Sequence, residues 1–172
     1  MTVYKKVKTE RLILSPTAEE DAEFIFELLN TPKWLEHIGD RNVKSVEGAK
    51  EYIQTKMLPQ LHRLGYGNYT VIRQSDEMKM GICGLFDREG LEGIDIGFAF
   101  LPAFEGNGYG FESADKLKNM AFDELGIQVI NAITTKENIS SQKLLDKLGL
   151  QLIGTTQLPN EEEELLLYKI KM

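Results

Sequence analysis

The stretch that decides the fold of this chain is Leu101-Pro102-Ala103-Phe104-Glu105-Gly106-Asn107-Gly108-Tyr109-Gly110-Phe111-Glu112. An apolar strand pattern leads into it and an amphipathic helix pattern follows it. Three glycines at alternate positions leave little side-chain bulk, so neighbouring backbone N–H groups can converge on one point. The helix N-terminus adds unpaired N–H donors and a partial positive charge. The stretch therefore predicts a site for phosphate groups, with an ordinary glycine turn as the alternative.

Two common phosphate-binding motifs do not fit this stretch. It lacks the lysine and the Ser/Thr that follow the glycines of a P-loop. A dinucleotide-binding fold places its glycines after the first strand of a parallel series, whereas here they follow the fourth strand of a pattern that contains antiparallel hairpins. The class of ligand must therefore be inferred from other residues.

The composition is that of an ordinary folded protein. The chain has 172 residues, of which 42% are hydrophobic and 27% are charged, and this length predicts a single domain over residues 1–172. The net charge of −7 argues against a nucleic-acid partner. No apolar run approaches the ~18 residues of a membrane span, so we expect no membrane partner and a cytoplasmic location.

Cysteine and histidine are scarce in this chain. The single cysteine, Cys83, lies in an apolar strand pattern, and we expect it to be a small buried hydrophobic residue. The two histidines, His37 and His62, have no Cys or His partner at ligand spacing. We therefore expect no metal site.

Apolar periodicity predicts the order of strands and helices. The expected strands are 10–16, 69–73, 79–86, 94–101, 128–135, 150–155 and 165–170. The expected helices are 17–30, 45–64, 111–125 and 138–148, with a short helical turn near 34–38. Strands joined by short turns pair antiparallel, whereas the strand–helix–strand unit through the glycine stretch must be parallel with a right-handed crossover. The expected fold is α/β (α+β by some schemes): a mixed, mostly antiparallel seven-stranded sheet with helices on both faces.

Three local signals refine the first two helices. Thr17 and Glu20 have the spacing of a capping box. Ser45 is the expected N-cap of the second helix. Pro59 lies inside that helix and is expected to kink or split it.

Three stretches together resemble the GNAT N-acetyltransferases. Residues 95–102 and 105–110 are similar to the coenzyme A-binding motif of that family. Residues 138–150 resemble the segment in which an asparagine opens a helix that ends in lysine–x–glycine–aromatic, with Leu150 at the last of these positions. The opening residues 9–14 are typical of the branch that resembles ribosomal-protein N-terminal acetyltransferases. The stretches occur in the family's order over nearly the whole chain, so the resemblance implies the GNAT fold and acetyl transfer from acetyl-CoA.

The resemblance also implies how the acetyl donor would be held. Its pyrophosphate would lie on the amides of the glycine stretch, and its pantetheine arm would pair with a strand backbone in the manner of an added strand. In the family, bulges in the fourth strand and its splaying from the fifth create the groove for this arm. A backbone N–H near Phe98 would polarise the thioester carbonyl. The implied binding residues are Phe98, Ala99, Phe100, Glu105, Gly106, Asn107, Gly108, Tyr109, Gly110, Phe111 and Asn138.

The reaction requires proton transfer, because an ordinary amine is protonated at pH 7 and lacks a free lone pair. Asp95 is the candidate base, with a structural sheet-edge carboxylate as the alternative. Ser141 is the candidate proton donor, with an ordinary first-turn serine as the alternative, and water is a further candidate for the base. Glu105 stands where Arg or Gln is common, so we expect its side chain to point away from the phosphates. Leu145 stands where many members have a tyrosine proton donor.

The acceptor stays open between a peptide N-terminus, a polyamine and a small amine. The family recognises its acceptor with the first helical region and the last hairpin. In this chain these regions point to Trp34, His37, Tyr52, Tyr66 and Tyr69, each with a core position as the alternative. The acidic run 161–164 could attract a basic acceptor or form a solvated loop.

Two other classes of function and one assembly state accompany this interpretation. A coenzyme A-binding module without catalysis is one alternative, because Leu145 and Glu105 depart from the family pattern. A nucleotide-binding regulator is the other. Many relatives form dimers, so the resemblance also allows a homodimer.

Overall fold

The computed structural model describes residues 4–172. Its strands are β1 (Val7–Lys8), β2 (Leu12–Pro16), β3 (Asn68–Arg73), β4 (Lys79–Asp87), β5 (Ile94–Phe100), β6 (Val129–Thr134), β7 (Gln151–Thr156) and β8 (Leu165–Lys171). Its α-helices are α1 (Ala22–Leu29), α2 (Pro32–His37), α3 (Val46–Tyr52), α4 (Leu58–Leu64), α5 (Tyr109–Asp123) and α6 (Ile139–Lys147). Two short 3₁₀ helices, η1 (Glu19–Asp21) and η3 (Pro102–Phe104), and one π-helix, η2 (Ile53–Met57), complete the elements.

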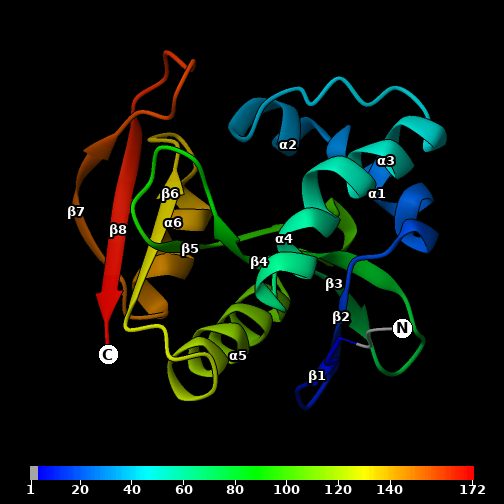
Figure 1. The fold of residues 1–172 in the computed structure, drawn as a ribbon, viewed down its shortest axis with the longest axis horizontal. Helices are drawn as coiled ribbons and strands as arrows, with labels where there is room; N and C mark the ends of the chain where they lie inside the picture. The colour runs from blue at the N-terminus through cyan, green and yellow to red at the C-terminus, as the bar shows by residue number, and fades with distance from the viewer. Residues whose placement is uncertain (1–3) are drawn as a thin grey trace.

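The strands form one mixed sheet in the order β1-β2-β3-β4-β5-β6-β8-β7. Every neighbouring pair is antiparallel except β5 and β6, which are parallel and are joined through α5. The mixed, mostly antiparallel α/β fold is thus confirmed (Figure 1). The expected number of seven strands was one too few. The additional strand, β1, pairs through only two residues with β2, and two residues are too few to give an apolar alternation.

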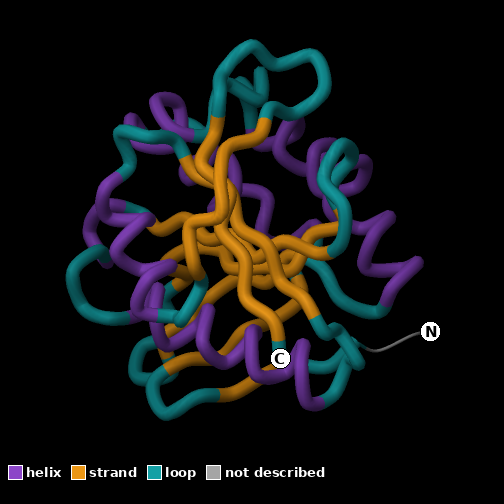
Figure 2. The backbone as a smooth tube through the Cα atoms, turned by 90° about the vertical axis from the view of Figure 1, so that its left-hand side faces the viewer, coloured by secondary structure: helices purple, strands orange, loops and turns teal. Residues whose placement is uncertain are grey.

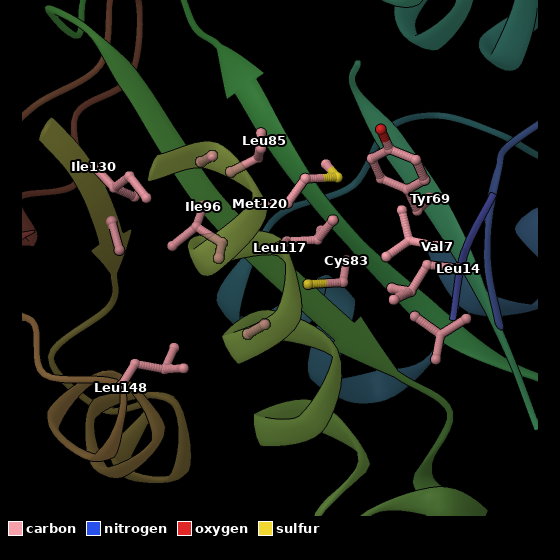
Figure 3. Packing of buried hydrophobic residues seen from close by; sticks show 14 of the residues in the cluster. Val7, Leu14, Tyr69, Cys83, Leu85, Ile96, Leu117, Met120, Ile130 and Leu148 are labelled. Carbon is pink, nitrogen blue, oxygen red and sulfur yellow. The ribbon is translucent and has the colours of Figure 1, made fainter. Parts of the chain in front are cut away.

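Helices cover both faces of the sheet, and each face has its own apolar core (Figure 2). On one face α5 lies across the strands, and its buried Leu117 and Met120 point toward Cys83 and Leu85 of β4 (Figure 3). On the other face α1, α2 and α3 pack with Ile82 of β4 and with Leu101. Burial raises the pKa of the Cys83 thiol to about 12, so this cysteine is a packing residue and not a nucleophile.

The start of the first helical region differs from the expected capping box. The 3₁₀ helix η1 begins one residue later, and the Ala18 N–H donates to Asp21 Oδ2 at 3.0 Å. The Thr17 hydroxyl instead bonds the hydroxyl of Thr70 on β3 at 2.9 Å. A buried threonine that bonds the sheet is not available to cap a helix, which explains the difference.

The second helical region shows how the chain accommodates Pro59. Ser45 caps α3 as expected, since its side chain accepts from the Gly48 N–H at 2.9 Å. The region then continues through the π-helix η2, in which the Leu58 N–H donates to Ile53 O, before α4 begins. The proline, which cannot donate a helical hydrogen bond, lies in the first turn of α4, and the wide π turn precedes it.

Candidate active site

The site begins where two strands separate. β5 and β6 pair at only two positions, Ile94 with Ile130 and Asp95 with Asn131. β5 continues to pair with β4 as far as Phe100, so beyond Asp95 its other edge has no strand partner. Figure 1 shows β5 and β6 running apart from this point. The result is a stretch of open backbone edge that an extended ligand arm can join.

The bulges that the family resemblance implied for this strand are not observed. The register of β4 with β5 is regular from Gly81 opposite Phe100 to Asp87 opposite Ile94. The register shifts in the sheet lie elsewhere, between β3 and β4 and between β7 and β8. In this chain the short parallel pairing alone opens the groove.

The glycine stretch leads into α5 with its amides exposed. Gly106 and Gly108 have φ angles of +79° and +81°, which residues other than glycine rarely adopt. The Glu112 N–H donates to Gly108 O at 3.0 Å as the first bond of the helix. The amides of Tyr109 and Gly110 therefore precede the first helical hydrogen bond and remain available to an anion.

A cavity of about 380 Å³, here called the loop cavity, lies against this stretch and the open edge of β5. Of the predicted cofactor-binding residues, all but Asn107 line it. The lining set among them is Phe98, Ala99, Phe100, Glu105, Gly106, Gly108, Tyr109, Gly110, Phe111 and Asn138. Asn107 instead shapes the loop: its side-chain N–H donates to Glu105 O at 3.1 Å.

The opening motif at residues 9–14 supports the glycine stretch from behind. Arg11 Nε donates to Glu112 Oε1 at 2.7 Å, and Arg11 Nη1 donates to Asn107 O at 3.1 Å. The Arg11 guanidinium lies 4.4 Å above the centre of the Tyr109 ring. The backbone N–H of Arg11 and the hydroxyl of Thr9 also donate to Glu112. A segment about a hundred residues away in sequence thus fixes both ends of the loop, and no local pattern would have indicated this role.

Three basic side chains that were not predicted from the sequence line the loop cavity. Lys33 of α2 forms an ion pair with Glu105 at 2.6 Å, so the glutamate is turned toward a cation that neutralises it. Lys143 and Lys147 lie one turn apart on α6, and Lys147 Nζ is 4.2 Å from the centre of the Phe111 ring. Their spacing of four residues in the motif 138–150 was the available signal.

A second cavity of about 270 Å³, here called the sheet cavity, lies deeper along β5 and β6. Asp95 lines it, as do Trp34, His37 and Tyr52 from the helical region predicted to recognise the acceptor. Tyr69 does not: it is 3% exposed in the core, and burial raises its pKa to about 12. Tyr66 packs against the same core and lines neither cavity.

Asp95 is the most deeply buried ionisable group of the sheet cavity, with 1% exposure. Its Oδ2 lies 3.3 Å from Arg88 Nη2, whereas its Oδ1 has no hydrogen-bond partner among the described residues. Burial raises the pKa of this carboxyl above its ordinary value, and Arg88 opposes the shift. The free oxygen and the raised pKa suit a group that can accept a proton from a ligand in this cavity.

The two cavities share one wall. The residues that line both are Trp34, His37, Ile38, Phe98, Ala99, Asn138 and Ser141. Asn138 caps α6, because its Oδ1 accepts from the Ser141 N–H at 3.2 Å. His37 is the ionisable member of this wall, and its Nδ1 lies 2.8 Å from Thr135 Oγ1. Leu145, where the family often has tyrosine, is buried and lines only the sheet cavity.

A loop with free backbone amides beside an open strand edge, next to a cavity with a buried carboxylate, fits an N-acetyltransferase. Comparison with known proteins defines the family. Residues 11–151 match the model of the acetyltransferase (GNAT) domain, and the chain belongs to the GNAT family of acetyltransferases. The family resemblance that the sequence predicted is therefore confirmed.

Individual relatives agree with this assignment. The chain is 28% identical over 149 residues to the uncharacterized N-acetyltransferase YoaA of Bacillus subtilis, covering 86% of this chain and 84% of that protein. The acetyltransferase of Agrobacterium tumefaciens has the same fold, with a TM-score of 0.84 at 20% identity over 100% of this chain and 97% of that one. RimL, a ribosomal L7/L12 alpha-N-protein acetyltransferase in complex with coenzyme A, has a TM-score of 0.81 at 18% identity, covering 98% of each chain.

Residues 4–172 contain neither a candidate metal-binding cluster nor a candidate membrane-spanning helix. No group of three or more His, Cys, Asp or Glu side chains in this part of the chain is arranged to hold a metal ion. None of the described helices is both long enough and apolar enough to cross a membrane.

Proposed function

We propose that this protein transfers the acetyl group of acetyl-CoA to a primary amine by direct attack in a ternary complex. The observation that carries the proposal is the wall shared by the loop cavity and the sheet cavity. Two substrates that enter from the two sides would meet at Phe98 and Ala99, without an intermediate on the protein.

The residues of the loop cavity fit coenzyme A. The free amides at the start of α5, together with Lys143 and Lys147, supply donors and positive charge for its phosphates. The open edge of β5 supplies backbone groups for the amide-containing pantetheine arm. Bound acetyl-CoA would supply an activated thioester, and the backbone N–H groups of β5 near Phe98 would polarise its carbonyl.

The chain's ionisable groups would then move the protons. A new N–C bond forms as the C–S bond breaks, the amine loses one proton and the thiolate gains one. Asp95 would take the amine proton, directly or through a water molecule, because it is buried in the sheet cavity with one oxygen free. Ser141 and His37, on the shared wall, are the two side chains that could return a proton to the thiolate.

Two measurements test the proposal. Acetyl-CoA and CoA should each raise the melting temperature of the protein, and ATP should do so less, because only CoA compounds fill the whole loop cavity. With a panel of amines, acetyl-CoA should then release free thiol in proportion to acetylated amine. Stabilisation by CoA without turnover on any amine would indicate a CoA-binding module without catalysis. If no CoA compound stabilises the protein, both the acetyltransferase and the binding module are refuted.

A further inference from the structure

The sheet cavity contains four charged side chains without an ion-pair partner in the described structure. Two are basic, Arg41 and Lys56, and two are acidic, Glu161 and Glu163. Other charges nearby are paired, as Arg88 is with Asp95 and Glu164 is with Lys136. Unpaired charges on a cavity wall are available to a ligand.

The four charges come from two separate parts of the fold. Arg41 follows α2 and Lys56 belongs to η2, between α3 and α4, whereas Glu161 and Glu163 lie in the connection between β7 and β8. Figure 1 shows that connection at the upper left and α3 and α4 on the right. The cavity is therefore polarised, with cationic side chains on its helical wall and anionic side chains on its β-hairpin wall.

The π-helix η2 shapes the cationic wall. Tyr52, Lys56 and Met57 all line the cavity, while Ile53 between them is fully buried. A π turn spaces its hydrogen bond five residues apart instead of four, as in the bond from Leu58 N–H to Ile53 O, and such turns are frequent at functional sites. The departure from α-helical geometry thus coincides with the segment that presents Lys56 to the ligand.

Resting on the proposed acetyl transfer, we propose that the acceptor is a primary amine that also carries an anionic group, such as a carboxylate. Arg41 and Lys56 bind the anionic group, and the amine lies toward Asp95 and the two glutamates. A polyamine would place a second cation against the basic wall, where like charges repel. The inference thus favours amino-acid-like or acidic peptide acceptors over polyamines.

Matched acceptors test this inference. The peptide amides Gly-Glu, Gly-Gln and Gly-Lys share one α-amine and differ in side-chain charge; the ε-amine of Gly-Lys is dimethylated, so that it keeps its charge but cannot be acetylated. The compounds γ-aminobutyrate and putrescine form a small-molecule pair of similar length. We expect kcat/KM for Gly-Glu to exceed that for Gly-Gln by about tenfold, and Gly-Lys to be the poorest of the three. The comparison of peptides with γ-aminobutyrate shows whether the anion belongs to a peptide or to a small amino acid.

Variants connect the preference to the proposed residues. In the double variant R41A/K56A, kcat/KM for Gly-Glu should be close to that for Gly-Gln. In R41E/K56E, kcat/KM should be highest for Gly-Lys. The control is K50A, which removes one positive charge from the neighbouring helix without touching the cavity. A ratio that R41A/K56A leaves unchanged, or a wild-type preference for Gly-Lys or putrescine, would overturn the inference.

A binding measurement separates this inference from the proposed function. Protein saturated with CoA lacks an acetyl group to transfer, so acceptors bind without reacting. The thermal shift with each peptide should follow the same order as the rates, and R41A/K56A should abolish that order. Absence of thiol release with every amine would refute the proposed transfer, while the order of the thermal shifts would still decide the inference.

Discussion

Replacement of Arg11 by alanine should weaken binding of coenzyme A although Arg11 does not line the loop cavity. The variant loses the bond to Asn107 O, the ion pair with Glu112 and the contact with the Tyr109 ring. All three contacts hold the glycine stretch in the conformation that exposes its amides. Without them a smaller fraction of the protein has a loop competent to bind, and the apparent Kd rises in inverse proportion to that fraction.

The size of the effect follows from these contacts. The hydrogen bond to the carbonyl contributes about 1 kcal/mol. The ion pair contributes ~0.5 kcal/mol, because the Arg11 side chain is 43% exposed and water screens it. The cation–π contact adds ~0.5 kcal/mol. A total near 2 kcal/mol corresponds to at most a ~30-fold rise in the Kd for CoA.

The variant should also change the pH dependence of stability. Burial raises the pKa of Glu112, but the bonds from Thr9 and Arg11 outweigh it, so the folded pKa lies below the ordinary value of 4.5. A carboxyl of this kind stabilises the fold above its unfolded pKa, and the stabilisation is lost as pH falls through the folded pKa. R11A should therefore be less stable than the parent at pH 7, and the difference should shrink toward pH 3.

Calorimetric titration with CoA, together with the KM for acetyl-CoA and kcat, measures the effect. We expect the Kd and the KM to rise together while kcat changes less than about twofold, because the reacting groups are untouched. R11K should recover part of the affinity, since it keeps a cation beside Glu112 but lacks the guanidinium fork. The control is K116A, which changes an exposed lysine on α5, the helix that carries Glu112. A lower melting temperature with an unchanged Kd for CoA would show that Arg11 only stabilises the fold.

Three further predictions concern the sheet cavity, the loop cavity and the wall that they share. D95N should lower kcat by ~100-fold or more with little change in the Kd for CoA. Because the pKa of Asp95 is raised, the activity of the parent protein should fall as the pH drops through that pKa. D95N should not show this fall in activity at low pH. An unchanged pH–rate profile would exclude Asp95 as the base. K143A/K147A should raise the KM for acetyl-CoA more at low salt than at high salt, because salt screens the contacts between lysine and phosphate. An equal rise in KM at low and high salt would argue against a role for the two lysine charges. H37Q should lower kcat with the KM for acetyl-CoA nearly constant if the imidazole returns the proton to the thiolate, and a normal kcat would leave Ser141 or water in that role.

Much of the donor side of the site could be predicted from the sequence because its chemistry resides in the backbone. Glycines at 106 and 108 mark left-handed positions, and an apolar strand before them marks the edge that holds the arm. Backbone groups are present whatever the side chains are, so a spacing pattern is enough to locate them. Asp95 was predicted on a different basis: its position on the fourth strand, shortly before the expected oxyanion donor, is one where the related branch of the family often has a glutamate.

The remaining site residues depend on tertiary contacts that leave no local pattern. Arg11 acts through Asn107 and Glu112, which only the fold brings together. Lys56 is exposed and Arg41 is partly exposed, and such cations occur all over a protein surface, so only the folded cavity distinguishes them. The regular pairing of β4 with β5 likewise could not be foreseen, since the family resemblance implied bulges there.

The most direct test of direct transfer is an initial-rate study in which acetyl-CoA and an accepted amine are varied together. Attack in a ternary complex predicts double-reciprocal lines that intersect, and a protein mass that stays unchanged after incubation with acetyl-CoA alone. Parallel lines together with a stable acetylated protein would show that the acetyl group passes through a side chain, and would contradict a reaction at the wall shared by the two cavities.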